Sequence, residues 1–128
     1  MNYRTITNRG GRRFFTDAQY EQLRANNEAT RVAQRAGLPE PDHVPVVRLF
    51  VPLSRCCWLL SEVYENGRAY GWCDLGWPEL GYVSLDELAE FSRLVPAFGT
   101  IVVERDTDWA SDGRTVGDIA GLNRRRAA

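Results

Sequence analysis

The segment Glu65 to Arg68, with the sequence Glu-Asn-Gly-Arg, constrains the fold of this chain most strongly. It lies between two runs that read as strands, Cys56 to Tyr64 and Ala69 to Leu75, both of which contain large aromatic side chains. An Asn-Gly pair favours a two-residue type I′ turn, because both residues tolerate a positive φ. The two runs are therefore predicted to form an antiparallel β-hairpin.

The turn also predicts a register for this hairpin. If Asn66 and Gly67 form the loop, Val63 faces Tyr70 and Leu60 faces Cys73. One face then carries Trp58, Leu60, Glu62, Tyr64, Cys73 and Leu75, and the other carries Leu59, Val63, Tyr70, Trp72 and Asp74. Both faces are largely apolar, so we expect both to be covered by helices or by a partner.

Further elements are predicted on both sides of the hairpin. Thr16 as an N-cap, with Gln19 three residues later, predicts a helix that runs to about Ala36. Its small residues Ala25, Ala29, Val32, Ala33 and Ala36 recur at helical spacing and are expected to pack against another element. Strands are predicted over Val46 to Val51, Leu80 to Val83 and Ile101 to Glu104, a short helix from the Ser84 capping box to about Phe91, and one helical turn within Thr115 to Leu122.

These elements predict an α+β fold. It has a small, mainly antiparallel sheet of about four to five strands, an N-terminal helix and a short helix after the fourth strand. With 128 residues, 44% of them apolar and 26% charged, the chain has the size and composition of one globular domain. We expect a partly ordered basic arm at residues 1–15, a single domain at residues 16–122 and a frayed basic tail at residues 123–128.

The distribution of charge and apolar residues bears on partners and compartment. No apolar run approaches the roughly 20 residues that cross a bilayer, so a cytoplasmic protein without a membrane partner is expected. The formal net charge is −1, and the basic residues gather near the chain ends. Arg9, Arg12 and Arg13 are candidates for nucleic-acid contact, but the acidic body does not favour nucleic acid as the partner.

The usual signatures of catalysis are missing from the sequence. Its three cysteines and one histidine fit neither a disulfide framework nor a zinc site, so reduced thiols and no cofactor are expected. His43 lies in a proline-rich connector, Leu38 to Pro45, and is expected to be a solvent-exposed loop residue. No nucleophile-elbow, phosphate-binding or dinucleotide-binding motif is present, which makes an enzyme the less favoured interpretation.

Two sets of residues remain as candidate sites. The carboxylates Asp74, Glu79, Glu104 and Asp106 would suit a hard cation if they converged, although pairing with arginines is the favoured interpretation. The aromatic-rich stretch between Trp58 and Tyr82 offers a recognition surface next to an acidic turn. Its candidate binding residues are Trp72, Trp77, Glu79, Tyr82 and Arg105.

Several segments together resemble an uncharacterised bacterial family, the domain of unknown function DUF2958. They are Val46 to Pro52, Trp58 to Glu62, Tyr70 to Asp74, the run Pro-Glu-Leu-Gly-Tyr-Val-Ser-Leu-Asp-Glu-Leu at residues 78–88, and Glu-Arg-Asp at residues 104–106. The resemblance begins at about Phe14 and implies a protein typically encoded on plasmids or integrative elements. It implies no activity and no catalytic residue, and the chain departs from the family pattern at Thr107 to Trp109.

Three hypotheses follow for the function. The preferred one is a non-enzymatic accessory protein of a plasmid or integrative element that binds a protein partner, which could be a second copy of itself. The first alternative is a metal-dependent hydrolase or nuclease that uses the clustered carboxylates. The second alternative is a DNA-binding accessory protein that uses the arginine-rich termini.

Overall fold

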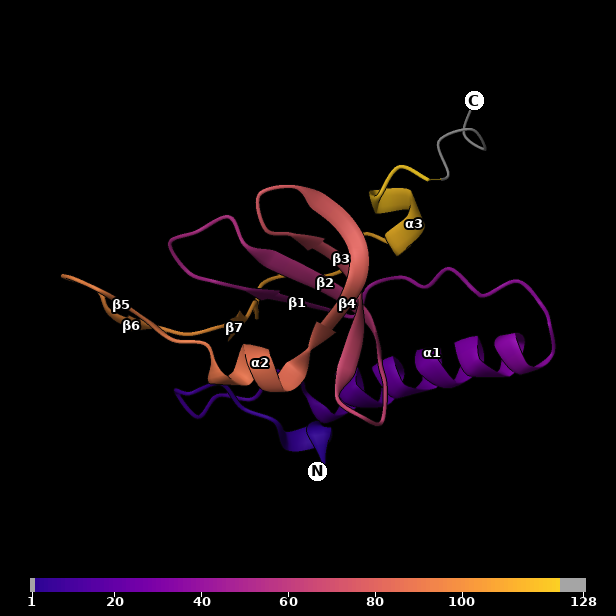
Figure 1. Cartoon of the computed structure of the whole chain (residues 1–128), viewed down its shortest axis with the longest axis horizontal. Helices are drawn as coiled ribbons and strands as arrows, with labels where there is room; N and C mark the ends of the chain where they lie inside the picture. The colour runs from indigo at the N-terminus through magenta and orange to yellow at the C-terminus, as the bar shows by residue number, and fades with distance from the viewer. Residues whose placement is uncertain (1, 123–128) are drawn as a thin grey trace.

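The computed structural model describes residues 2–122, which form a five-stranded antiparallel sheet flanked by helices (Figure 1). The strand order is β4-β3-β2-β1-β7, with β1 Val47–Phe50, β2 Cys57–Val63, β3 Arg68–Asp74, β4 Pro78–Ser84 and β7 Glu104–Arg105. Strands β5 (Arg93–Val95) and β6 (Gly99–Ile101) form a separate hairpin. The helices are α1 (Asp17–Arg35), α2 (Leu85–Glu90) and α3 (Val116–Ile119), and a 3₁₀ turn spans Tyr3–Thr5. The predicted fold class, including the N-terminal helix and the short helix after the fourth strand, is confirmed.

Helix α1 begins at the predicted capping box. The Gln19 backbone N–H donates to Thr16 Oγ1 at 3.0 Å, and the Gln19 side chain accepts from the Thr16 N–H at 2.9 Å. The helix ends before Gly37, whose φ of +69° suits glycine. Local sequence therefore determines both ends of this helix.

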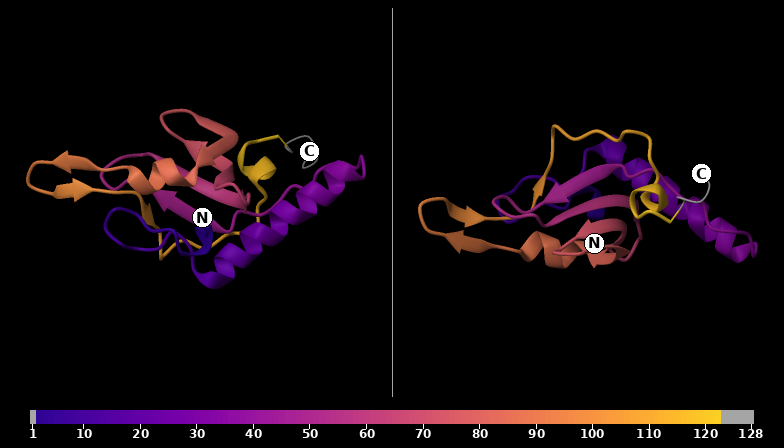
Figure 2. Two further views of the ribbon diagram at one scale, coloured as in Figure 1. Left: turned by 60° about the horizontal axis from the view of Figure 1, so that its bottom comes forward. Right: turned by 90° about the horizontal axis from the view of Figure 1, so that it is seen from above.

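The predicted packing face of α1 is wrong. The buried side chains are Leu23, Asn27, Thr30 and Ala33, whereas Ala25, Ala29 and Ala36 are exposed and Val32 is 50% exposed. The helix lies against the part of β2 that extends beyond β1, where the carbonyls of β2 lack a strand partner (Figure 2). Asn26 Nδ2 donates to the Ser61 carbonyl at 3.0 Å, and Arg24 donates to the Val63 carbonyl. The strand edge needs donors, so α1 presents polar side chains to it.

The β2–β3 hairpin forms as predicted, but its turn and register differ. The loop has three residues, because the Tyr64 N–H donates to the Arg68 carbonyl at 2.8 Å and the Gly67 N–H to the Tyr64 carbonyl at 3.1 Å. Within this loop only Gly67 has a positive φ, +86°, which excludes the type I′ turn. The pairing therefore differs from the predicted one, and Leu60 faces Gly71 rather than Cys73.

A β-bulge at Ser61 changes which side chains share a face. The pairing passes from Leu60 opposite Gly71 to Glu62 opposite Tyr70, so Ser61 is an extra residue in β2. The predicted faces were therefore wrong for Glu62, Val63 and Tyr64. Glu62 and Tyr64 lie on the outer face with Tyr70, whereas Val63 is fully buried opposite Ala69 in the core.

The inner face of the sheet holds the core. The strands contribute Val47, Leu49, Trp58, Leu60 and Val63. These side chains pack with Leu23 of α1, with Leu85 and Leu88 of α2, and with Tyr3, Phe14 and Phe15 of the segment that precedes α1. The outer face is partly covered by α3 and by the connector before β1. The inner face is therefore covered by helices, whereas the outer face is covered only in part.

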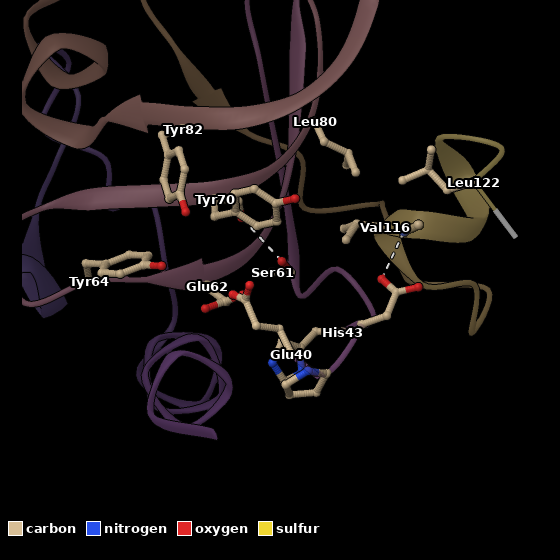
Figure 3. A pocket seen from close by; sticks show the side chains of 13 residues that line it. Glu40, His43, Ser61, Glu62, Tyr64, Tyr70, Leu80, Tyr82, Val116 and Leu122 are labelled. Carbon is tan, nitrogen blue, oxygen red and sulfur yellow. Dashed lines mark hydrogen bonds between the residues drawn. The ribbon is translucent and has the colours of Figure 1, made fainter. Parts of the chain in front are cut away.

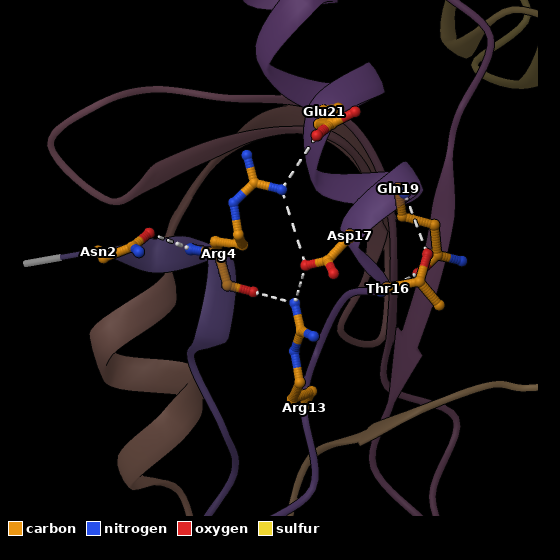
Figure 4. A network of polar contacts seen from close by, with 7 residues as sticks. All are labelled: Asn2, Arg4, Arg13, Thr16, Asp17, Gln19 and Glu21. Atoms are coloured by element: carbon orange, nitrogen blue, oxygen red, sulfur yellow. Dashed lines mark hydrogen bonds and ion pairs between the residues drawn. The ribbon is translucent and has the colours of Figure 1, made fainter.

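Polar contacts hold the N-terminal segment in place. Arg13 Nη2 donates to the Arg4 carbonyl at 2.7 Å and to Asp17 at 2.9 Å, and Arg4 donates to Glu21 at 3.2 Å (Figure 4). Asn8 Nδ2 reaches the Val103 carbonyl at 2.8 Å from a buried position. Residues 2–15 are therefore tied to α1 and to the C-terminal part of the core.

The C-terminal third differs most from the predicted elements. The predicted strand Ile101 to Glu104 is divided, since β6 ends at Ile101, β7 begins at Glu104 and the two intervening valines are buried. The β5–β6 hairpin was not predicted, and it projects from the body with Leu94 and Phe98 exposed (Figure 1). The predicted helical turn is α3, which Thr115 and Asp118 cap. The predicted tail, residues 123–128, lies outside the described residues.

Glycines 71 and 81 face each other on β3 and β4 and provide a test of the bulge. A Cβ on Gly71 would overlap the carbonyl oxygen of Leu59, whereas a Cβ on Gly81 would meet no atom within 4 Å. Gly71→Ala should therefore lower the free energy of unfolding by about 1–3 kcal/mol, and Gly81→Ala should change it by less than about 0.5 kcal/mol. Urea denaturation measures both, and equal midpoints for the two variants would contradict the close approach at the bulge.

Candidate functional site

A cavity of about 350 Å³ opens on the outer face of the sheet. Its walls come from β2, β3, β4, the connector before β1 and α3 (Figure 3). The lining includes Glu40, His43, Ser61, Glu62, Tyr64, Tyr70, Leu80, Tyr82, Val116 and Leu122. Segments distant in the sequence thus meet around one space.

Three tyrosines form one wall of this cavity. Tyr70 and Tyr82 face each other across the β3–β4 ladder, and their ring centroids lie 5.0 Å apart. The Tyr64 ring meets that of Tyr82 edge-on at 5.9 Å. Arg68, which is not among the lining residues, places its guanidinium 4.1 Å from the Tyr82 ring centroid. These rings are therefore close enough to contact the same ligand, and the Tyr82 ring already contacts a cation, the Arg68 guanidinium.

The hydroxyl groups of Tyr64 and Tyr70 resist ionisation. Burial raises the pKa of Tyr64 above its usual range, and a hydrogen bond with Tyr82 and the negative charge of Glu62 add to the effect. Burial is also the main cause of the raised pKa of Tyr70, with the neighbouring Tyr82 and Glu62 contributing. The phenols of Tyr64 and Tyr70 therefore remain neutral at physiological pH, where they can donate and accept hydrogen bonds.

Glu62 is a buried carboxylate at the cavity, and only 5% of the residue is exposed. Its Oε1 accepts from Asn27 Nδ2 at 3.2 Å, and Asn27 in turn accepts from Arg24 at 3.0 Å. Within residues 2–122, no group donates a hydrogen bond to Oε2, and the carboxylate is directed toward the cavity (Figure 3). In the part of the chain that the structure describes, the lining includes no arginine that could neutralise it.

The connector residues are fixed in position. His43 is half-buried, and its Nε2 lies 3.0 Å from Thr30 Oγ1 of α1, so the expectation of a solvent-exposed loop histidine was wrong. The Val116 N–H donates to the His43 carbonyl at 2.9 Å. Asp42 accepts from the Gly117 N–H at 3.0 Å and from Thr115 Oγ1 at 2.6 Å. The connector thereby joins α1 to α3 and closes one side of the cavity.

The structure brings together part of the binding surface predicted from the sequence. Trp72 and Glu79 line a second cavity of about 440 Å³, which adjoins the first and shares Leu80 and Leu122 with it. Tyr82 lines the first cavity, and Trp77, 66% exposed, lies in the turn that connects β3 to β4.

Arg105 is not part of this surface. It lies on β7, at the opposite edge of the sheet, and lines a different cavity with Arg12, Arg13 and Glu104. The predicted binding residues are therefore divided between the two edges.

The four candidate metal ligands are divided in the same way. Asp74 and Glu79 lie at the β3–β4 edge, whereas Glu104 and Asp106 lie at or just beyond β7. Glu104 forms an ion pair with Arg12, and Asp106 pairs with Arg48 at 3.0 Å. In the part of the chain that the structure describes, no group of three or more histidine, cysteine, aspartate or glutamate side chains is arranged to hold a metal ion.

The basic residues proposed for nucleic-acid contact make contacts within the chain. Arg12 and Arg13 pair with Glu104 and Asp17, and Arg9 donates to the Glu90 carbonyl at 3.3 Å. Two of the three guanidinium charges are thus balanced locally, which weakens the attraction that a phosphate backbone would feel.

The cysteines are free thiols in the structure. Burial raises the pKa of both Cys57 and Cys73. Because a thiolate is the nucleophile, these two residues are poorly suited to covalent catalysis.

Glu62, Tyr64, Tyr70 and Asn27 were not among the candidate residues predicted from the sequence. Their convergence depends on the bulge at Ser61 and on the packing of α1 against β2. Neither feature leaves a local pattern in the sequence.

Comparison with known proteins gives one match. The family described as "Protein of unknown function (DUF2958)" matches residues 14–118. No curated protein and no solved structure matches the chain. Within residues 2–122, none of the helices combines the length and apolarity that crossing a membrane requires.

The raised pKa of Tyr64 predicts a loss of stability at alkaline pH. The folded chain holds this proton more tightly than the unfolded chain, so the stabilisation is complete below about pH 10 and is lost as the pH rises through the folded pKa. Tyr64→Phe should therefore reduce the fall in unfolding free energy above about pH 10. Urea midpoints at neutral and alkaline pH measure this, and an unchanged slope would contradict the assignment.

Proposed function

The chain belongs to the DUF2958 family, a family of proteins of unknown function, and we propose that it is a non-enzymatic protein that binds a protein partner. The binding surface comprises the two adjoining cavities and the turn along the β3–β4 edge. The resemblance described above supports a role as an accessory protein of a plasmid or integrative element. We refer to Trp72, Trp77, Glu79, Leu80 and Tyr82 as the β3–β4 surface.

One observation carries the proposal. Large apolar and aromatic side chains are exposed side by side with hollows deep enough to receive side chains from a partner. Trp77 is 66% exposed, Tyr82 is 53% exposed and Leu122, which lines both cavities, is 69% exposed. Aromatic residues beside pockets are the usual anchors of protein interfaces.

The charge of this surface supports a basic partner. Glu79 lines the second cavity, and Glu40 and Glu62 line the first. Among residues 2–122, the linings of both cavities contain no arginine. Acidic groups of this kind speed the encounter with a positively charged surface and exclude an acidic one.

The chemistry of the site supports binding rather than catalysis. The phenols of Tyr64 and Tyr70 keep their protons because their pKa values are raised. The thiols of the buried Cys57 and the half-buried Cys73 also have raised pKa values, which disfavours a nucleophilic role. The groups that surround the cavities are therefore better suited to contact than to proton transfer.

Trp77 and Phe98 provide a matched pair of variants for the proposed surface. Both are aromatic and similarly exposed, 66% and 68%, but Phe98 lies on the β5–β6 hairpin, outside the β3–β4 surface. Trp77→Ala should weaken binding of a protein captured from host extract by roughly tenfold or more, because a central aromatic anchor is lost. Phe98→Ala should leave it unchanged.

Affinity is measured by titrating the captured protein, once purified, against each folded variant, with circular dichroism as the check on folding. Loss of binding in Phe98→Ala with full binding in Trp77→Ala would place the interface on the hairpin and refute the proposed surface.

A further inference from the structure

We infer that the tyrosine-lined cavity binds the guanidinium or primary ammonium group of an arginine or lysine side chain. The inference rests on the proposed function in one respect, namely that the partner carries this side chain. The residues involved are Glu62, Tyr64, Tyr70 and Tyr82, with Glu40 at the same cavity.

Glu62 supplies the main reason for a cationic ligand. Only 5% of Glu62 is exposed, and a carboxylate in so buried a residue is costly unless a cation or several donors compensate for its lost hydration. Asn27 supplies one neutral donor, at 3.2 Å, and Oε2 has no hydrogen-bond donor within residues 2–122. A guanidinium or ammonium group would give this oxygen a charged donor from the direction in which it faces (Figure 3).

The aromatic wall favours the same chemistry. The π-faces of tyrosine attract cations, and the Tyr82 ring already lies 4.1 Å from the guanidinium carbon of Arg68. The neutral phenols of Tyr64 and Tyr70 can also accept hydrogen bonds from N–H donors. One ligand group can therefore meet a carboxylate, hydroxyl oxygens and ring faces within the same cavity.

The lining disfavours other classes of ligand. An anion would meet Glu40 and Glu62, and the described residues of the lining offer no arginine to balance its charge. A metal ion would need several ligands, and the described residues hold no cluster of three. The volume of about 350 Å³ is roughly ten times that of a water molecule in the liquid, which accommodates the end of a long side chain.

The test does not need the partner. The probe is Nα-acetyl-arginine amide, titrated into the full chain while the NMR signals of the tyrosine rings are followed. Saturable shifts are expected at Tyr64, Tyr70 and Tyr82. The citrulline analogue, which has the same shape without the charge, should cause no shifts, and equal shifts from the two compounds would overturn the inference.

Two variants distinguish a specific contact between the probe and Glu62 from a general effect of the negative charge of the protein. Glu62→Gln keeps the shape of the side chain and should weaken binding of the arginine probe roughly tenfold or more. Glu90→Gln removes the same charge from an exposed residue that lines neither cavity and should leave binding within about twofold. Equal weakening in both variants would overturn the inference. Thermal melting checks that each variant is folded, and Glu62→Gln should melt no lower than the wild type because Asn27 can still donate to the glutamine carbonyl oxygen.

The partner provides the second arm of the experiment. If Glu62→Gln and Trp77→Ala both weaken binding of the partner, the cavity receives a basic side chain from the partner. If the partner binds through Trp77 while the arginine probe fails to bind, the cavity inference is overturned and the proposed function stands. If the arginine probe binds but neither variant changes the binding of a captured protein, the proposed function is refuted. The inferred link between the cavity and a protein partner is then refuted as well.

Discussion

The close approach of Leu59 and Leu60 to Gly71 is the contact on which the rest of the structure depends. A glycine at this position lets β2 carry one extra residue, Ser61, opposite β3. Without the bulge, Glu62 would face Ala69 in the core and Val63 would point outward. The bulge thus places an apolar side chain inside and a carboxylate at the outer cavity, and one backbone feature serves both the core and the candidate site.

The second constraint is the unpaired edge of β2 beyond β1. Its carbonyls need donors, and α1 supplies them through Asn26 and Arg24, which accounts for the polar character of a helix face that packs against the sheet. The same turn of α1 places Asn27, fully buried, against Glu62. The same polar face of α1 therefore pairs the edge of β2 and positions the Glu62 carboxylate. A purely apolar helix face could do neither.

Features with a local chemical cause were predictable from the sequence. Thr16 and Gln19 determine where α1 begins, Ser84 begins α2, and the Asn-Gly pair determines that β2 returns as β3. Features that depend on contacts between distant residues were not. The bulge depends on Gly71 meeting Leu59, the polar face of α1 depends on a strand edge, and the cavity combines Asn27, Glu62 and Tyr82. The proximity of Trp72, Glu79 and Tyr82 was predictable because the β3–β4 pairing keeps neighbours together, whereas Arg105 lies across three strands.

The contacts of Glu62 show which of its properties the fold requires and which it does not. A glutamine there could still accept a hydrogen bond from Asn27 through its carbonyl oxygen, so the core contact does not require a charge. Arg24 lies beyond Asn27 and can only polarise it, because its own hydrogen bonds go to Asn27, Val63 and Glu65. A negative charge that the fold does not need, held beside three tyrosine rings and facing an open cavity, lowers the stability of the free protein and raises its affinity for a cation. The same unpaired oxygen accounts for both effects.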